Sequence, residues 1–210
     1  MKSVYSVDVN NFSLQIEGAN LLQRPEDGAY FAEIEHGAHF AVAVQSNWGH
    51  SKSPFECEMT LNGEKLGVFQ GSSRIRVETK PDSGKKLTAF VKGSAEAYQA
   101  GQSSSFSGDV GLIKLVMFPS KEKDPYLMDF FDVDCNSRSL SKGATRGIAP
   151  TPMQIGLQGK SDQTFKTVAS IDRDYSNETT VYIRLIEKNS SYNEITPLNE
   201  VKKETPYPRL

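Results

Sequence analysis

The stretch that decides the fold reads Phe55-Glu56-Cys57-Glu58-Met59-Thr60-Leu61-Asn62-Gly63-Glu64-Lys65-Leu66-Gly67-Val68-Phe69. From Phe55 to Leu61 apolar side chains recur at every second position, so one face of a strand can be buried while the other faces water. Asn62-Gly63 then supplies two residues that tolerate positive φ, as a two-residue type I′ turn requires. The stretch therefore predicts a β-hairpin, and we expect it to be the centre of an antiparallel meander over residues 28–91.

Short alternating stretches continue on both sides of this hairpin. They cover residues 5–9, 12–16, 30–35, 39–44, 74–78, 87–91, 165–172 and 179–186. We expect 30–35 to pair with 39–44 across the His36-Gly37 turn, and 87–91 to pair back on 74–78 across Pro81–Gly84. The most hydrophobic run, Gly111–Pro119, predicts a central strand that is buried on both faces.

These elements predict an all-β fold, because no convincing amphipathic helix interrupts them. We expect an antiparallel β-sandwich or jelly roll of roughly eight to ten strands. The predicted organisation has N-terminal strands in residues 1–27, a β-sandwich domain over 28–187 and a proline-containing arm over 188–210. Within the domain, residues 93–109 and 120–163 lack periodicity and are expected to be long loops, with Gly156–Gly159 setting a turn.

Composition narrows the function classes. The 210 residues are 37% hydrophobic, which is enough to bury a sizeable core. With 24 basic against 26 acidic residues, the net charge of −2 gives no long-range attraction to nucleic acid or anionic lipid. No apolar run approaches the ~20 residues that span a bilayer, and the first residues do not resemble a signal peptide. We therefore expect no membrane and no direct nucleic-acid partner.

The two cysteines bear on the redox compartment and therefore on the localisation. Cys57 and Cys135 lie far apart without CxxC spacing. This fits free thiols in a reducing compartment or one bridge between them. We expect a cytoplasmic location, or a virion if the chain is viral.

Candidate reactive groups each have a simpler interpretation. His36, His39 and His50, with Glu35, could supply zinc ligands, but a His-x-x-His pair on a hairpin does not by itself orient both rings at one metal. The cluster Asp129, Asp132 and Asp134 lacks the remainder of a calcium loop. The serines show no Gly-x-Ser-x-Gly elbow. We expect no enzymatic activity, no metal and no cofactor.

Six residues are candidates for contact with a ligand or partner: Trp48, Arg74, Arg76, Tyr126, Tyr207 and Arg209. Trp48 is the only tryptophan and lies in a polar connection, where it is either a platform for a ligand or a lid on the edge of the core. Arg74 and Arg76 share one strand face with Glu78, which fits an acidic partner or a surface ion pair. Tyr207 and Arg209 belong to the arm.

Several stretches spread over the chain resemble one family. They are Gly28-Ala29-Tyr30, His36-Gly37, Phe40, Cys57, Asn62-Gly63, Gly67, Ser72-Ser73-Arg74-Ile75, Gly111–Val116, Gly156–Phe165, Ile171–Asp174 and Thr179–Leu185. The chain is similar over most of residues 28–186 to an uncharacterised β-rich group encoded by algae, other protists and some large DNA viruses. The family pattern has a basic residue before the hairpin cysteine and a small one after it, whereas this chain has Glu56 and Glu58. The resemblance implies no catalytic residues.

The viral members of that group, together with size and β-content, are similar to single jelly-roll vertex proteins of large icosahedral viruses. The resemblance implies a non-enzymatic structural protein, most concretely a penton-like capsid vertex component. Its partners would be copies of itself in a cyclic homo-oligomer such as a pentamer, and neighbouring shell proteins. The alternative is a lectin-like module that stacks Trp48, Tyr30 or Tyr126 on a sugar.

Overall fold

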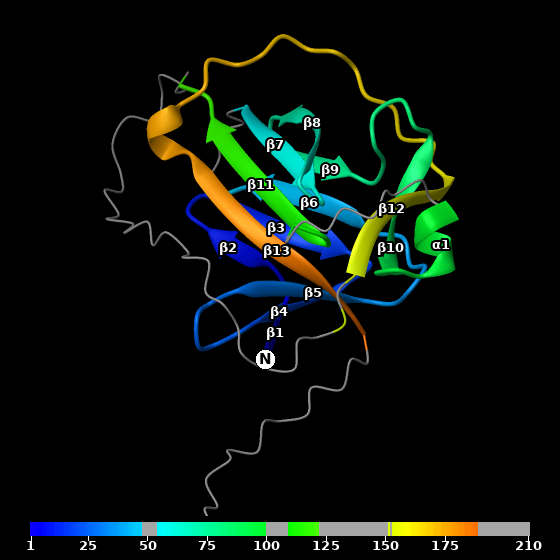
Figure 1. Ribbon diagram of the computed structural model, residues 1–210. Helices are drawn as coiled ribbons and strands as arrows, with labels where there is room; N and C mark the ends of the chain where they lie inside the picture. The colour runs from blue at the N-terminus through cyan, green and yellow to red at the C-terminus, as the bar shows by residue number, and fades with distance from the viewer. Residues whose placement is uncertain (48–53, 100–108, 122–150, 152, 189–210) are drawn as a thin grey trace, which may run out of the picture.

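Thirteen strands form three sheets in the computed structural model, which describes residues 1–47, 54–99, 109–121, 151 and 153–188 (Figure 1). The largest sheet has seven strands, in the spatial order β1 (Lys2–Val4), β4 (Asn20–Gln23), β5 (Tyr30–Ile34), β13 (Thr179–Glu187), β11 (Leu112–Pro119), β7 (Phe55–Leu61) and β8 (Glu64–Gly71). All neighbours in it are antiparallel except β5 and β13, which run parallel.

The second sheet has four strands, in the order β2 (Val7–Val9), β3 (Phe12–Glu17), β6 (Ala41–Ser46) and β9 (Arg74–Val77). A two-stranded ribbon of β10 (Lys85–Val91) and β12 (Met153–Lys160) is the third. A short helix, α1 (Ala95–Gln99), and a 3-10 turn, η1 (Tyr175–Asn177), complete the described elements. Within this part of the chain, no helix is long and apolar enough to cross a membrane.

One hydrophobic core joins the sheets. It contains inward-facing residues of the seven-stranded sheet, such as Met59 and Leu115, of the four-stranded sheet, such as Leu14, and of the ribbon, such as Ile155. The predicted all-β sandwich is therefore confirmed. The strand count exceeds the expected eight to ten because three strands were not predicted: β1 and β4, which are only three and four residues long, and β12.

The predicted hairpin is also confirmed. Asn62 and Gly63 both have positive φ, +52° and +83°, and β7 pairs with β8 from Phe55 opposite Gly71 to Leu61 opposite Glu64. The predicted central strand is β11, which lies between β13 and β7. It is fully buried on one face only: Ile113, Leu115 and Met117 are buried, whereas Lys114 and the other residues of its outer face before Phe118 are partly exposed.

The predicted meander over residues 28–91 is wrong. Strands β5 and β6 do not pair across the His36-Gly37 turn, because β5 lies in the seven-stranded sheet and β6 in the four-stranded one. Strand β10 pairs with β12, and only a bridge between Thr79 and Lys86 joins it to the end of the β9 segment. A period of two shows which face of a strand is buried, but it does not show which strand lies beside it.

Two predictions around the second long loop are wrong as well. Strand β12 lies inside the expected loop 120–163, and Gly156–Gly159 is part of that strand rather than a turn. Its register places Gly156 opposite Thr88 and leaves Met153–Ile155 buried. Conversely, residues 165–172, predicted to be a strand, form no regular structure. Most of the loops 93–109 and 120–163, and the arm after residue 188, lie outside the described residues.

The strand order determines which strands form the edges of the two larger sheets. β1 and β8 are the two edges of the seven-stranded sheet, and β2 and β9 are the two edges of the four-stranded sheet. Because β1 and β2 adjoin in sequence, as do β8 and β9, each side of the sandwich carries one edge from each sheet. The strands of residues 1–27 pair with later ones, β3 with β6 and β4 with β5.

Candidate functional site

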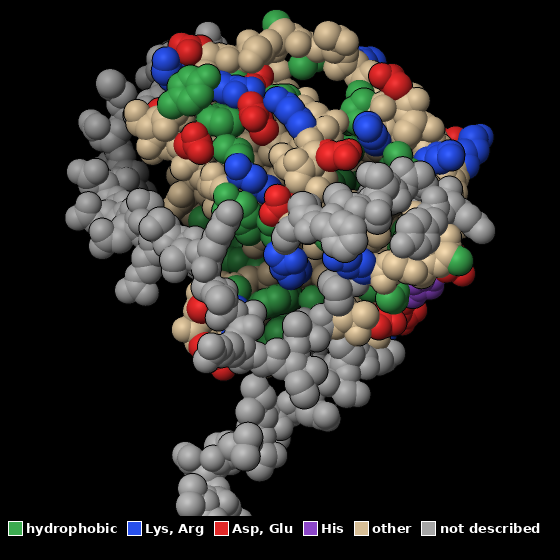
Figure 2. Space-filling view, viewed as in Figure 1, with side chains coloured by type: hydrophobic (Ala, Val, Ile, Leu, Met, Phe, Trp, Pro, Cys, Tyr) green, Lys and Arg blue, Asp and Glu red, His purple; other side chains and the backbone are tan. Residues whose placement is uncertain are grey.

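The connection from β12 to β13 passes over the β8 and β9 side of the sandwich, at the top of Figure 1. We call residues 164–170 the arch. Every residue in it is exposed, and the backbone of Thr164–Ala169 forms no hydrogen bond within the part of the chain that the structure describes. The space-filling view shows an opening beneath this connection (Figure 2). The arch is therefore a strand-like sequence without a strand partner in the described chain.

One end of the arch is anchored on strand β9 by a side chain that takes the place of a neighbouring strand. The Gln163 amide donates from Nε2 to the carbonyl of Arg76 at 2.7 Å, and its Oε1 accepts from the N–H of Glu78 at 2.9 Å. Ser161 adds a hydroxyl bond of 2.8 Å to the Glu78 carboxylate and a backbone bond of 2.9 Å to Gly84. These bonds fix the chain at the point where it leaves the ribbon.

The two predicted contact arginines of strand β9 belong to the same neighbourhood. Arg74 and Arg76 both bind the carboxylate of Glu17 on β3, at 2.6 and 2.7 Å, and Arg76 also binds Glu78 at 2.8 Å. The Arg76 guanidinium and the Ser161 hydroxyl lower the pKa of Glu78 below its ordinary value. Both guanidinium groups therefore form ion pairs within the chain, while their side chains remain 51% and 43% exposed.

The other end of the arch is anchored on a buried carboxylate. Glu56 of β7 is 3% exposed and accepts three hydrogen bonds, from the Ser170 hydroxyl at 2.9 Å, the Ile171 N–H at 3.0 Å and Arg173 Nε at 2.7 Å. Burial alone would raise the pKa of Glu56, but these three donors outweigh it and lower the pKa below its ordinary value. Glu56 is thus a charged hub that holds the segment against the sheet.

Arg173 completes this anchor. Its second nitrogen binds Glu58 at 2.7 Å, and its guanidinium lies over the ring of Phe118, 4.5 Å from the centroid. The Phe118 ring also meets Tyr175 edge-on. Burial works against the charged guanidinium, but the two carboxylates outweigh it and raise the pKa of Arg173. Charge pairing and stacking together fix the side chain in one position.

A single aromatic contact supports the arch between its anchors. The Phe165 ring packs on Phe69 of strand β8, with centroids 5.2 Å apart, and Phe69 is a member of the core. Phe165 itself is 37% exposed and Val168 is 60% exposed. Apolar side chains are consequently presented to solvent on a segment that is held at both ends.

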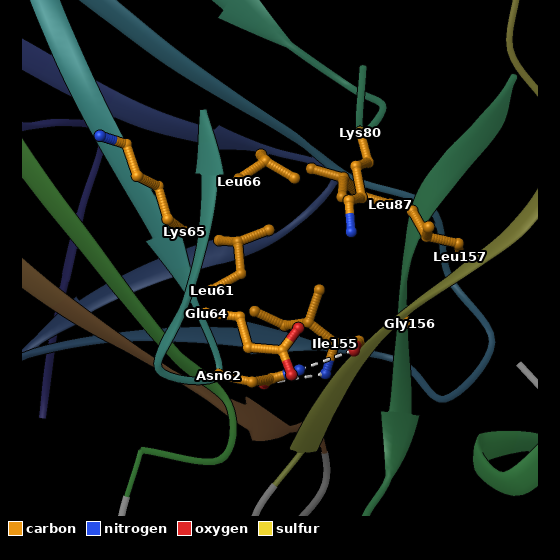
Figure 3. Close-up of a pocket in the computed structure, with 10 residues that line it drawn as sticks. All are labelled: Leu61, Asn62, Glu64, Lys65, Leu66, Lys80, Leu87, Ile155, Gly156 and Leu157. Atoms are coloured by element: carbon orange, nitrogen blue, oxygen red, sulfur yellow. Dashed lines mark hydrogen bonds between the residues drawn. The ribbon is translucent and has the colours of Figure 1, made fainter. Parts of the chain in front are cut away.

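A small cavity of about 70 Å³ lies nearby, between the tip of the β7–β8 hairpin and the β10–β12 ribbon (Figure 3). At its base the Asn62 amide bonds the ribbon, donating to the Ile155 carbonyl at 2.7 Å and accepting from the Ile155 N–H at 3.3 Å. Leucine side chains line much of the remainder, with Lys80 above. The volume has room for a few water molecules, against ~300–1,000 Å³ for typical small-molecule sites.

The remaining predicted residues divide into two groups. Trp48, Tyr126, Tyr207 and Arg209 lie outside the described residues, as do His50, Cys135 and the Asp129–Asp134 cluster. Tyr30, the one described aromatic residue of the lectin hypothesis, is partly buried and packs against the core. Burial raises its pKa.

The first two histidines have separate partners. His39 Nδ1 is 2.9 Å from the Thr88 hydroxyl, whereas His36 Nδ1 accepts from the Val91 N–H at 3.0 Å. Glu35, the other candidate ligand, binds Lys188 at 2.8 Å. The structure identifies no group of three or more His, Cys, Asp or Glu side chains that could hold a metal, within the described ranges.

Sequence reasoning missed the residues that anchor the arch. Glu56 stands on the polar phase of its strand, so the alternation pattern assigned it to solvent. Arg173 and Gln163 lie far in sequence from their partners Glu56 and Arg76, and a single sequence contains no pattern that would predict these contacts.

Comparisons of the chain with protein-family models, with curated proteins and with solved structures found no match.

Proposed function

We propose that this chain is a non-enzymatic structural protein that builds an assembly through contacts between copies. The observation that carries the proposal is the arch: an exposed, strand-like segment, held at both ends, whose backbone groups lack partners in the described chain. Backbone donors and acceptors of an extended segment can be satisfied by another chain. Such a segment is a natural site for protein contact.

The two anchors make the arch suitable for that role. Docking a loose loop costs conformational entropy, and a loop already held in position loses less on binding. The Glu56–Arg173 pair fixes one end and the Gln163 amide the other. Val168 and Phe165 between them supply exposed apolar area, which contributes most to affinity when a partner excludes water from it.

In its most concrete form, the proposal is a penton-like vertex component of a virion shell, with a jelly-roll sandwich. Cyclic assemblies use one surface of each copy against a different surface of the next. The sandwich offers two distinct sides, β1 with β2 and β8 with β9. Residues 188–210 would act as an arm that contacts a neighbouring shell protein.

Light scattering coupled to size-exclusion chromatography tests the proposal on the full chain. We expect a discrete particle of several copies, which negative-stain microscopy would show as a ring. A chain that stays monomeric up to roughly 100 μM, where a contact of micromolar Kd would be saturated, would contradict self-assembly. Discrete dimers without rings would retain an assembly role and remove the vertex form of the proposal.

A further inference from the structure

The arch has the geometry that an endopeptidase requires of a folded substrate. Such an enzyme binds a stretch of its substrate in extended form and pairs with its backbone, as an added strand does. The stretch must therefore be exposed, without backbone hydrogen bonds to its own protein, and clear of the body of the molecule. Every residue of the arch is exposed, and the backbone of residues 164–169 forms no hydrogen bond within the described chain. The opening beneath the connection leaves room around it (Figure 2).

One basic side chain lies in this stretch. Lys166 is exposed, and it forms no ion pair within the part of the chain that the structure describes. The other described lysines and arginines lie in or next to strands, in hydrogen-bonded turns or at the anchors. Lys160 shows the difference: it is 87% exposed, but it ends β12, and the following N–H, of Ser161, donates to the Gly84 carbonyl at 2.9 Å. Exposure of the side chain alone does not make the backbone accessible.

We propose that the Lys166–Thr167 bond is a processing site for an endopeptidase of trypsin-like specificity, which takes a lysine or arginine side chain in an acidic pocket. Hydrolysis breaks the bond between the Lys166 carbonyl carbon and the Thr167 nitrogen. Water supplies a hydroxyl to that carbon and a proton to the new amine. Because both ends of the arch are already held, the segment loses little entropy when the enzyme binds it. The site needs no second copy, so it is independent of the proposed self-assembly.

The strand order determines what happens to the two pieces. Strand β13 follows the cut, yet it lies between β5 and β11, which both precede the cut. Residues 179–184 pair with β11 and residues 183–187 pair with β5. The bonds of Arg173 to Glu56 and Glu58 also join one piece to the other. Cleavage therefore opens the arch and leaves the sandwich standing as a molecule of two chains.

Brief digestion of the dilute full-length chain with trypsin tests the site. Mass spectrometry counts the new N-termini while most molecules have been cut no more than once. The N-terminus at Thr167 should appear at least about tenfold faster than the one at Ser161, because the bond after Lys160 must first open locally. Equal rates, or a Thr167 terminus that appears only after unfolding in urea, would overturn the proposal.

The Lys166→Gln chain is the matched control. The Lys166 side chain is exposed, so circular dichroism should be unchanged, the Thr167 terminus should disappear and the slow cut after Lys160 should remain. Gel filtration of the cut wild-type chain then follows the pieces: we expect the fragment that carries β13 to elute with the remainder and to separate only in denaturant. Separation without denaturant would refute the two-chain product. A lasting complex of trypsin with the uncut chain would make the arch an inhibitory loop and refute processing.

Discussion

The Glu56 hub permits the sharpest test of how the arch is held. Replacing Glu56 with Gln preserves size and one carbonyl oxygen but removes the charge that Arg173 faces at 2.7 Å. Removing one partner of a buried ion pair typically costs about 3–5 kcal/mol. Arg173 keeps Glu58 and is 17% exposed, so part of that loss is recovered. We therefore expect Glu56→Gln to lower the free energy of unfolding by about 2–3 kcal/mol.

Glu58→Gln is the matched control for this substitution. Glu58 gives Arg173 one bond and is 30% exposed, so solvent replaces much of what the carboxylate supplies. We expect a loss of about 1 kcal/mol or less in urea unfolding at pH 7. Hydrogen exchange at the Ile171 N–H, which donates to Glu56, should accelerate in the Glu56 variant and much less in the control.

The pH dependence gives the same test a second readout. The folded protein lowers the pKa of Glu56 below its reference value of 4.5, so its contribution is complete above pH 4.5 and disappears as the pH falls through the folded pKa. The stability difference between wild type and Glu56→Gln should therefore shrink on acidification below pH 4.5. Equal losses for the two variants, a difference that does not change with pH, or unaltered exchange at Ile171 would refute the assignment of Glu56 as the hub.

Three further predictions concern neighbouring features. Asn62→Gly keeps the positive φ of the turn but deletes the hydrogen bonds to Ile155 at 2.7 and 3.3 Å. It should therefore lower the free energy of unfolding, measured in urea, by about 2 kcal/mol. Asn62→Asp keeps the acceptor oxygen and should lower it by less. Burial raises the pKa of Cys57 to about 12, so in the Cys135→Ser chain iodoacetamide at pH 8 should label it only after unfolding; rapid native labelling would contradict this. Phe165→Ala removes the ring packed 5.2 Å from Phe69, and should cost about 1 kcal/mol and speed proteolysis within the arch; an unchanged cleavage pattern would count against that contact.

Sequence patterns predicted strands and turns well where these depend only on residues close together in the sequence. The Asn62-Gly63 turn and the alternation from Phe55 to Leu61 depend on φ preference and side-chain phase, both of which a short sequence carries. Strand β12 was missed because Gly156 and Gly159 were interpreted as turn residues. Gly156 stands opposite Thr88 of β10 and Gly159 lies where the register shifts, and both places follow from pairing with residues about seventy positions earlier, which no local pattern contains.

The arch shows the opposite error. Residues 165–172 have strand-like alternation, yet the backbone of residues 165–169 forms no hydrogen bond within the described chain, because the segment is fixed at its two ends, by Gln163 and by Glu56. The candidate contact residues Arg74 and Arg76 were placed correctly on one strand face, and Glu78 was recognised as a partner. Glu17, which bonds both arginines from another strand, could not be found from a sequence separation of more than fifty residues.

The position of β13 also has a consequence for biosynthesis. This strand, residues 179–187, joins β11, β7 and β8 on one side to β5, β4 and β1 on the other, so the large sheet exists as two halves until it inserts. On the ribosome, both halves would emerge with unpaired strand edges until β13, the last strand of the described chain, is translated. Pairings between such distant residues form slowly, and open edges invite aggregation in the meantime. A stop codon before Thr179 should therefore yield inclusion bodies rather than a shortened soluble sandwich, and slower translation would lengthen the nascent chain's dependence on chaperones.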